Sequence, residues 1–302
     1  MYKLRAFNDI IKEICKEKDI EYQELSDDWI IKLKKNNKIR FIVGYKFDLN
    51  TQALSEICND KYALYTVLSS ENLPIIESQI LFKNEEQNLE KYFDLYGKNV
   101  VIKPNNGTCG NNVIHAKNLE ELKLAYEKIL QRNNSVVICP FYNILSEYRV
   151  IYLRNKKYIY KKVKPQVIGD GIHNINELLK KFNEFYYKNP EHLKNDMFDL
   201  NYIPYEGEII EYEWRFNLSK GAKIEKTSDY ENEILSKMAD KIAEILDLKF
   251  VSIDIIKNSD NKFMVMEINS GVMTENLIKQ SNNGKEIAKE IYSEAINQMF
   301  II

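Results

Sequence analysis

Two stretches near the end of the chain, Phe250-Val-Ser-Ile-Asp254-Ile-Ile256 and Val265-Met-Glu267-Ile-Asn269-Ser270, decide its fold. Both are rich in residues that favour strands, and the segment between them is polar, so we predict a β-hairpin. Side chains two apart in a strand leave the same face, as Glu267 and Asn269 do. Oxygen donors from adjacent strands suit a hard cation that also keeps phosphate and water as ligands. Asp254, Glu267 and Asn269 are therefore candidate metal ligands, and an ordinary exposed hairpin face is the alternative.

A second motif lies well upstream, in Asn99-Val-Val-Ile-Lys103-Pro-Asn-Asn-Gly107-Thr-Cys-Gly110-Asn-Asn-Val113. We expect an apolar strand that ends at a lysine and a proline and is followed by a loop of small and polar residues. Lysine offers a compact positive charge to a phosphate, and glycine lets backbone N–H groups approach phosphate oxygens. The spacing fits neither the Walker motif nor the dinucleotide fingerprint, so alone it also fits an ordinary turn. Combined with the downstream acidic set, it predicts a phosphate-binding site.

The two motifs together resemble those of the ATP-grasp ligases, in that family's order and spacing. Further similar segments are Asn59-Asp60-Lys61 with Leu73-Pro74, Val136-Val-Ile-Cys-Pro-Phe-Tyr142, and Glu147. Three more segments are similar to the branch of cyanophycin synthetase, glutathione synthetase and ribosomal-protein glutamate ligase: Gly169-Asp170-Gly171-Ile-His-Asn-Ile-Asn-Glu-Leu-Leu179, Ile203-Pro-Tyr-Glu-Gly207-Glu and Asn217-Leu-Ser-Lys-Gly221. The resemblance covers about residues 45 to 295. One departure is Asn112, which stands where relatives place a third glycine and leaves a different loop closure open.

The resemblance implies an α/β (α+β) ATP-grasp fold of three subdomains, with ATP held between two α+β lobes. We expect an N-terminal domain at 1–95, a small lobe with the glycine loop at 96–139, and a large lobe at 140–302 that contains a substrate-covering insert at 172–212. From the residue patterns we expect a strand at 39–43, helices at 59–70 and 119–130, and a hairpin of 147–153 with 158–163.

Site residues follow from the same resemblance. The residues expected to hold ATP are Lys61, Lys103, Gly107, Thr108, Gly110, Cys139, Phe141, Tyr142 and Glu147. The backbone of the 136–142 strand would read adenine, Glu147 would hold the ribose hydroxyls, and the two lysines would neutralise phosphates. Two Mg²⁺ ions, with Mn²⁺ as an alternative, would bind Asp254, Glu267 and Asn269.

Two arginines are candidate catalytic groups. Strand alternation puts Arg149 on one face with Glu147 and the apolar Ile151, which should be a packed side. A buried arginine needs a partner, so Arg149 either pairs with an internal carboxylate or faces the transferred phosphate. Arg215 and Asn217 form an expected same-face pair, and in the ligases that this chain resembles such an arginine stabilises the acyl phosphate or tetrahedral intermediate. One of Lys161 and Lys162 would line the cleft.

The resemblance implies ATP-dependent carboxylate–amine ligation through an acyl phosphate, with release of ADP and phosphate. The substrates would be a small-molecule or peptide carboxylate and an amine, such as amino acids. Two alternatives stay open: a phosphotransferase that stops at a phosphorylated small molecule, and a ligase that adds amino acids to a peptide or protein.

Composition limits the partners and the compartment. The chain has 302 residues, 44% hydrophobic and 29% charged, with a net charge of −2 that gives no footprint for nucleic acid or an anionic membrane. Four cysteines without paired spacing argue against disulfides and zinc and favour a reducing cytosol. No segment has the pattern of a signal peptide or the length of a membrane span. We therefore expect a cytoplasmic protein, with a homodimer left open.

Overall fold

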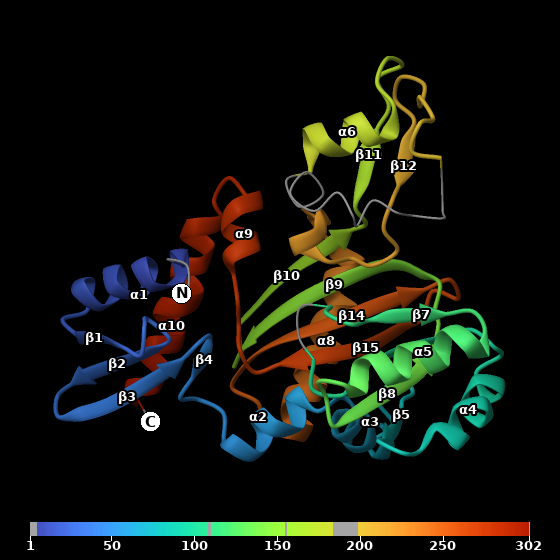
Figure 1. The fold of residues 1–302 in the computed structure, drawn as a ribbon. Coiled ribbons are helices and arrows are strands. Elements are labelled where there is room, and N and C mark those ends of the chain that lie inside the picture. Colours follow the sequence, from blue (N-terminus) through green and yellow to red (C-terminus); the bar gives the residue numbers. More distant parts are fainter. Residues whose placement is uncertain (1–4, 108–109, 155, 184–198, 302) are drawn as a thin grey trace. The chain divides into compact units, whose positions relative to one another are not determined.

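The computed structural model describes residues 5–107, 110–154, 156–183 and 199–301. The chain divides into two compact units: residues 1–159 with 227–302 form unit 1, and residues 160–226 form unit 2. Figure 1 shows the fold coloured along the chain. No helix in these ranges combines the length and the hydropathy that crossing a bilayer requires.

The N-terminal part of unit 1 is a four-stranded antiparallel sheet with helices on one face (Figure 1). Its strands, in sheet order, are β1 (Glu21–Leu25), β2 (Ile30–Lys35), β3 (Lys38–Val43) and β4 (Lys46–Phe47). The helices are α1 (Ala6–Glu17) and α10 (Gly284–Ile301), with α9 (Glu275–Gln280) beside them. The rings of Phe7, Phe47 and Tyr292 pack against one another between these elements. β3 confirms the strand predicted at 39–43.

The central part of unit 1 contains the predicted hairpin. Strands β9 (Ile144–Leu153), β14 (Phe250–Asn258) and β15 (Phe263–Asn269) are neighbours and antiparallel, and β10 (Lys156–Val163) starts beside β9. One face of this sheet packs its apolar side chains against α2 (Gln52–Asn59), α3 (Lys61–Ser70) and α8 (Asp229–Leu246). Both predicted hairpins are confirmed. The helix expected at 59–70 is divided at Asp60, whose carboxylate caps α3 by accepting from the N–H of Ala63 at 2.8 Å.

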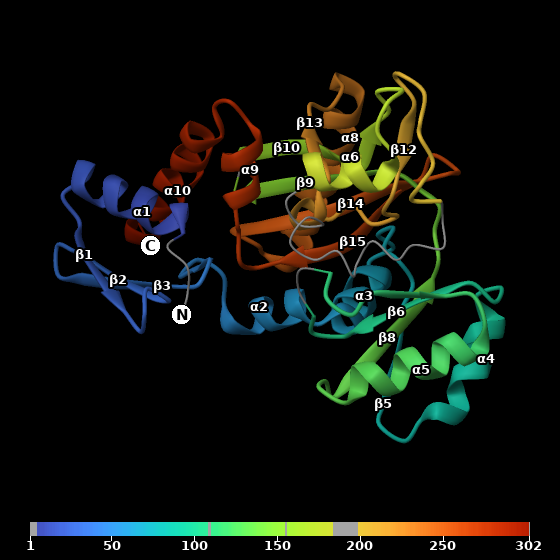
Figure 2. The ribbon, with the colours of Figure 1, turned by 45° about the horizontal axis from the view of Figure 1, so that its top comes forward.

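A second four-stranded antiparallel sheet follows in unit 1, with α4 and α5 covering one face (Figure 2). Its strands, in sheet order, are β5 (Gln79–Phe82), β8 (Ser135–Pro140), β6 (Val100–Pro104) and β7 (Ile114–Ala116). Its helices are η1 (Glu86–Asn88), α4 (Leu89–Leu95) and α5 (Leu119–Leu130). α5 has the predicted bounds, and Asn118 caps it by accepting from the N–H of Glu121. Because β5 and α4 precede residue 96, this sheet uses residues from both sides of the expected boundary, and the three-subdomain division stays a prediction.

Unit 2 is small and has its own core. The end of β10 pairs with β13 (Lys223–Glu225), and β11 (Gln166–Ile168) pairs with β12 (Ile209–Glu211). Helix α6 (Ile175–Phe182) packs on the second pair through Ile175, Leu178 and Leu179. η3 (Leu218–Lys220) precedes β13. The insert expected at 172–212 supplies α6 and β12, and its residues 184–198 lie outside the described ranges.

Candidate active site

The three predicted metal ligands and Arg149 lie on one face of the central sheet. Arg149 is directly opposite Asp254, and Asp254 is directly opposite Glu267, so the three side chains form a row across β9, β14 and β15. Asn269 is opposite Ser252 and leaves the same face. The register shifts beside Asp254, and such an irregularity often changes the direction of a nearby side chain. We call this surface the site face, and Glu147 belongs to it because it is two residues from Arg149.

Both faces of the central sheet are packed. On one face, β9 contributes Tyr148, Val150 and Tyr152 to a hydrophobic cluster with α2, α3 and α8. On the site face, Ile151 and Leu153 are 0% exposed, so the prediction that Arg149 lies on a packed side is confirmed. Polar groups of the site face are covered as well, since Glu147 is buried and Asp254 is 1% exposed.

Arg149 and Asp254 form a bidentate ion pair. Nε donates to Oδ1 at 2.7 Å and Nη2 donates to Oδ2 at 2.6 Å. The Arg149 side chain is 16% exposed and that of Asp254 is 2% exposed, so water screens the pair weakly. Of the two interpretations of Arg149, the structure shows the pairing with an internal carboxylate. That carboxylate is itself a predicted metal ligand, so the arginine fixes its orientation.

The donors on the site face fit Mg²⁺ by their chemistry. Asn269 donates from Nδ2 to Glu267 Oε1 at 3.1 Å, which orients its amide and leaves the carbonyl oxygen as the end that can coordinate. Within the described residues there is no group of three His, Cys, Asp or Glu side chains that could hold a metal. The candidate set is therefore two carboxylates and an amide, all oxygen donors, which is the ligand type that Mg²⁺ prefers.

The two predicted phosphate lysines lie at the start of α3 and at the end of β6. Lys61 Nζ donates to the carbonyl oxygens of Asn105 at 3.2 Å and Gly107 at 2.8 Å. Lys103 is buried. Burial lowers the pKa of Lys61 to about 8; the negative charge of Glu267 opposes this shift, and the positive charge of Lys103 adds to it. Lys61 thus feels the charges of both Lys103 and Glu267, although the three residues come from separate segments.

In the glycine loop, residues 105–112, two of the described positions have a left-handed backbone. Gly110 has φ 65° and Asn112 has φ 55°. Asparagine tolerates this region better than other residues with a side chain. Asn112 therefore adopts the conformation that a glycine would favour there, and the departure from the family pattern does not require a different backbone at this residue. Thr108 and Cys109 lie outside the described residues.

The segment predicted to read adenine, residues 136–142, which we call the hinge, continues beyond the end of the neighbouring strand β5. β5 pairs with β8 only as far as Ile138, and Cys139, Phe141 and Tyr142 follow. Cys139 is buried, and burial raises the pKa of its thiol, which disfavours the nucleophilic thiolate. The Phe141 ring stacks on that of His115 at 3.8 Å.

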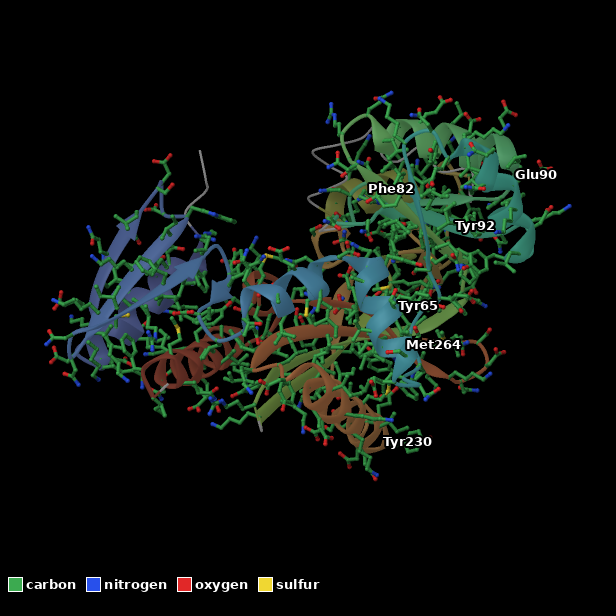
Figure 3. All side chains as sticks on the ribbon, turned by 90° about the horizontal axis from the view of Figure 1, so that it is seen from below. Tyr65, Phe82, Glu90, Tyr92, Tyr230 and Met264 are labelled. Atoms are coloured by element: carbon green, nitrogen blue, oxygen red, sulfur yellow. The ribbon has the colours of Figure 1, made fainter. Side chains whose placement is uncertain are left out.

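Tyr142 lines a pocket of about 450 Å³ together with Tyr65 of α3 and Met264 of β15. Figure 3 shows Tyr65 and Met264 beside each other on this side of unit 1. The pocket also includes the chain segment that runs along the edge of β15, where Ile76 N donates to Val265 O at 2.9 Å.

In unit 2 the structure corrects one expectation. Residues 212–217 do not form a strand, so the same-face pairing of Arg215 with Asn217 was wrong. Arg215 instead donates from Nε and Nη2 to the two carboxylate oxygens of Glu213, at 3.0 and 2.6 Å. Asn217 caps η3 by accepting from the N–H of Ser219. Of the two lysines on β10, Lys162 is buried and Lys161 is half-buried.

Comparisons with known proteins bear on the fold of the chain. Residues 205–295 match the model of the RimK-like ATP-grasp domain. The structure aligns over 97% of its length with a bifunctional glutathione synthetase from Pasteurella multocida, at a TM-score of 0.59 and 18% identity, covering 44% of that chain. The chain has the ATP-grasp fold. A D-alanine–D-alanine ligase from Bacillus anthracis shares this fold, at a TM-score of 0.57 and 18% identity over 85% of our chain and 71% of the other.

Curated relatives of this ATP-grasp chain are longer. It is 24% identical over 267 residues to the cyanophycin synthetase of Trichormus variabilis, covering 82% of our chain and 29% of the relative. It is 26% identical over 268 residues to a glutathione biosynthesis bifunctional protein of Listeria monocytogenes, covering 77% of our chain and 34% of the relative. The chain thus spans about a third of the length of these relatives.

One pair of polar residues in the ATP-grasp chain was not singled out from sequence. In unit 2, Asp170 Oδ2 lies 2.7 Å from His173 Nδ1, and Asp170 Oδ1 accepts from the backbone N–H of His173 at 2.8 Å. These hydrogen bonds lower the pKa of Asp170. A carboxylate only accepts, so Nδ1 carries the hydrogen, and a neutral ring then presents Nε2 as a proton acceptor. The Asp-x-x-His spacing was the available signal, but spacing alone does not establish a contact.

Proposed function

We propose that this chain is an ATP-dependent carboxylate–amine ligase that forms an amide bond through an acyl phosphate. The observation that carries the proposal is that Glu267 lies directly opposite Asp254, the partner of Arg149, while the charges of Glu267 and Lys103 both act on Lys61. Positive groups for phosphates and oxygen donors for a metal are thus next to each other, as phosphoryl transfer requires. The site carries the proposal, because a fold by itself does not imply an activity.

In the proposed first step, a substrate carboxylate oxygen attacks the γ-phosphorus of ATP, and the bond to the β–γ bridging oxygen breaks to release ADP. Lys61 and Lys103 would attract the phosphate oxygens, and the glycine loop would cover the γ-phosphate and exclude water. Mg²⁺ held by Asp254, Glu267 and Asn269 would offset the charge on the phosphate oxygens. The protein contributes positioning and charge neutralisation.

In the second step, an amine nitrogen attacks the acyl carbon, the bond to phosphate breaks, and the nitrogen loses a proton. A guanidinium can stabilise the oxyanion that forms on the acyl group, a role we assign to Arg215. Arg149, bound to both oxygens of Asp254, would contribute to the reaction by holding that metal ligand in place. The hinge residues Cys139, Phe141 and Tyr142 would contact the adenine, and Glu147 the ribose. By analogy with relatives such as the D-alanine–D-alanine ligase, we propose amino acids or a peptide as substrates.

We also propose two Mg²⁺ ions at the site and a cytoplasmic location. The three cysteines that the structure describes, Cys15, Cys58 and Cys139, are buried and unbridged, which fits a reducing compartment.

The test of the proposed function is an array of carboxylates and amines, amino acids and dipeptides included, mixed pairwise with the chain, ATP and Mg²⁺. We expect ADP and phosphate to appear only when both partners are present, with a product whose mass is their sum less one water. Hydroxylamine in place of the amine should trap the acyl phosphate as a hydroxamate. ADP release with a stable phosphorylated product and no need of an amine would contradict the proposal in favour of a phosphotransferase.

ATP binding should depend on pH through Lys61. Because its pKa is lowered to about 8, the ammonium loses its proton as the pH rises through 8, and its attraction for phosphate is lost. We expect the Kd for ATP to increase above pH 8, with proton uptake on binding there, and titration calorimetry in buffers of different ionisation enthalpy measures both. Lys61→Arg should remove this dependence, since a guanidinium stays protonated. An unchanged pH profile in Lys61→Arg would contradict the assignment.

The same lowered pKa has a consequence for stability. The unfolded chain has an ordinary lysine with a pKa of 10.5, so between about 8 and 10.5 it binds more protons than the folded chain. The free energy of unfolding therefore increases as the pH rises through this window, so Lys61 makes the folded chain more stable at pH 10.5 than at pH 8.

A further inference from the structure

The buried side chain of Asn105 joins the glycine loop to the start of α3. It follows Lys103-Pro104 directly and is only 2% exposed. Nδ2 donates to Asp60 Oδ2 at 2.7 Å, and Oδ1 accepts from the backbone N–H of Tyr62 at 3.0 Å. Both ends of one amide are therefore used by residues at the N-terminus of the same helix.

The backbone of Asn105 adds to this connection. Its carbonyl oxygen accepts from Lys61 twice, from the backbone N–H at 3.3 Å and from Nζ at 3.2 Å. The first N–H groups of a helix have no partner within the helix, and here the loop supplies partners for two of them. Asp60 completes the arrangement because its other oxygen, Oδ1, caps α3 at Ala63. Each of these hydrogen bonds joins the loop to residues 60–63 or stays within them.

Lys61 is the residue that this arrangement places. Its Nζ also reaches the carbonyl oxygen of Gly107, at 2.8 Å, farther along the loop. A lysine side chain has several rotatable bonds, and a glycine-rich loop has many backbone conformations, so ordering both at once on ligand binding costs entropy. A contact that orders them beforehand makes binding tighter by reducing that cost.

We propose that Asp60 and Asn105 form a latch, and that Asn105 is a positioning residue that holds Lys61 and residues 105–107, the start of the glycine loop, ready for the phosphates of ATP. This inference rests on the proposed function, because it concerns the same ATP site. Asn105 does not touch the phosphates in this role; it acts through Lys61 and the loop backbone.

The latch can be broken by one substitution and restored by a second. Asn105→Asp places a carboxylate against that of Asp60, so the hydrogen bond from Nδ2 is lost and repulsion replaces it. The reciprocal exchange, Asp60→Asn with Asn105→Asp, returns an amide–carboxylate pair. The amide now at position 60 can donate to the carboxylate at position 105 and still accept from the N–H of Ala63 with its oxygen. The second carboxylate oxygen at position 105 accepts from the N–H of Tyr62, so all three side-chain hydrogen bonds and the net charge are retained.

The experiment measures the Kd for ATP with Mg²⁺ by titration calorimetry on the full chain and its variants. We expect Asn105→Asp to raise Kd by roughly tenfold or more, the scale of one charge-assisted hydrogen bond, and the exchange to recover most of that loss. Asn106→Asp is the matched control, since Asn106 is exposed and its substitution adds the same charge to the same loop. It should raise Kd much less. The exchange keeps the test decisive even if Asn105→Asp alone fails to fold, because the double variant restores the hydrogen bonds.

If Asn105 had a purely structural role, Asn105→Asp would change the midpoint of thermal unfolding but not the pH at which the Kd for ATP begins to rise. If Asn105 acts in the latch, Asn105→Asp releases Lys61 from its buried position, and the rise in Kd should begin at a higher pH. The reciprocal exchange should restore the original pH. A Kd and pH profile in Asn105→Asp equal to those of the unchanged chain would overturn the latch alone. If the unchanged chain binds no ATP, the proposed function fails and this inference fails with it.

Discussion

Glu267→Gln is expected to abolish ATP turnover while leaving the fold of the chain intact. Glutamine keeps the shape of the side chain and can still accept from Asn269 Nδ2, so the hydrogen bond at 3.1 Å can remain. What it loses is the negative charge that faces Lys61 and that would hold a divalent cation. Removing a charged metal ligand forfeits several kcal/mol of transition-state stabilisation, so we expect turnover to fall roughly a hundredfold or more.

The control for this substitution is Asp260→Asn, which removes an exposed carboxylate at the turn of the same hairpin and should leave turnover unchanged. Turnover is followed as ADP release over a titration of Mg²⁺, and folding is followed by circular dichroism. Turnover that is lost at ordinary Mg²⁺ concentrations and is partly restored at higher ones would support Glu267 as a ligand. Retained turnover at ordinary Mg²⁺ concentrations would exclude it.

The hairpin that carries Glu267 could be predicted because its signal is local. Alternation with a period of two fixes which side chains share a face, and the polar segment between the strands marks the turn. The helix at 119–130 is equally local, since its apolar residues recur at helical spacing and Asn118 caps it. The pairing of β9 with β14 is different. It joins residues about a hundred positions apart, so the contact between Arg149 and Asp254 depends on a register that no local pattern records.

Two other contacts show the same limit. The alternation in Glu213-Trp-Arg-Phe-Asn217 favours a strand, but the Arg215 guanidinium pairs with Glu213 and Asn217 caps η3, and these local hydrogen bonds compete with a sheet ladder. In the sequence, Asn105 is one of several polar residues in the loop. What distinguishes it is its hydrogen bond to Asp60, more than forty residues earlier in the chain, which the sequence does not reveal. Residue types thus indicated which groups belong to the site, and the tertiary structure determined which of them touch.

Arg149→Met is expected to destabilise the fold strongly. It leaves the Asp254 carboxylate, 2% exposed, without the guanidinium that binds both of its oxygens. Breaking a buried ion pair by removing one partner costs about 3–5 kcal/mol, mostly because the remaining charge is uncompensated. Mg²⁺ should recover part of that loss, because a cation bound at Asp254 replaces the missing positive charge. Denaturant unfolding with and without Mg²⁺ measures both effects.

The double variant Arg149→Met with Asp254→Asn removes the orphaned charge and should be more stable than Arg149→Met alone. The pair would then show a clear coupling energy in the double-mutant cycle. Lys237→Met is the matched control, because Lys237 pairs with Glu233 on the exposed surface of α8 and its loss should cost less than about 1 kcal/mol. Additive effects at Arg149 and Asp254 would mean that the bidentate pair contributes nothing to stability. A clear coupling energy, together with recovery of stability by Mg²⁺ in Arg149→Met, would instead mean that the guanidinium neutralises Asp254 before a metal binds. Once Mg²⁺ is bound, the metal and the guanidinium would neutralise that carboxylate together.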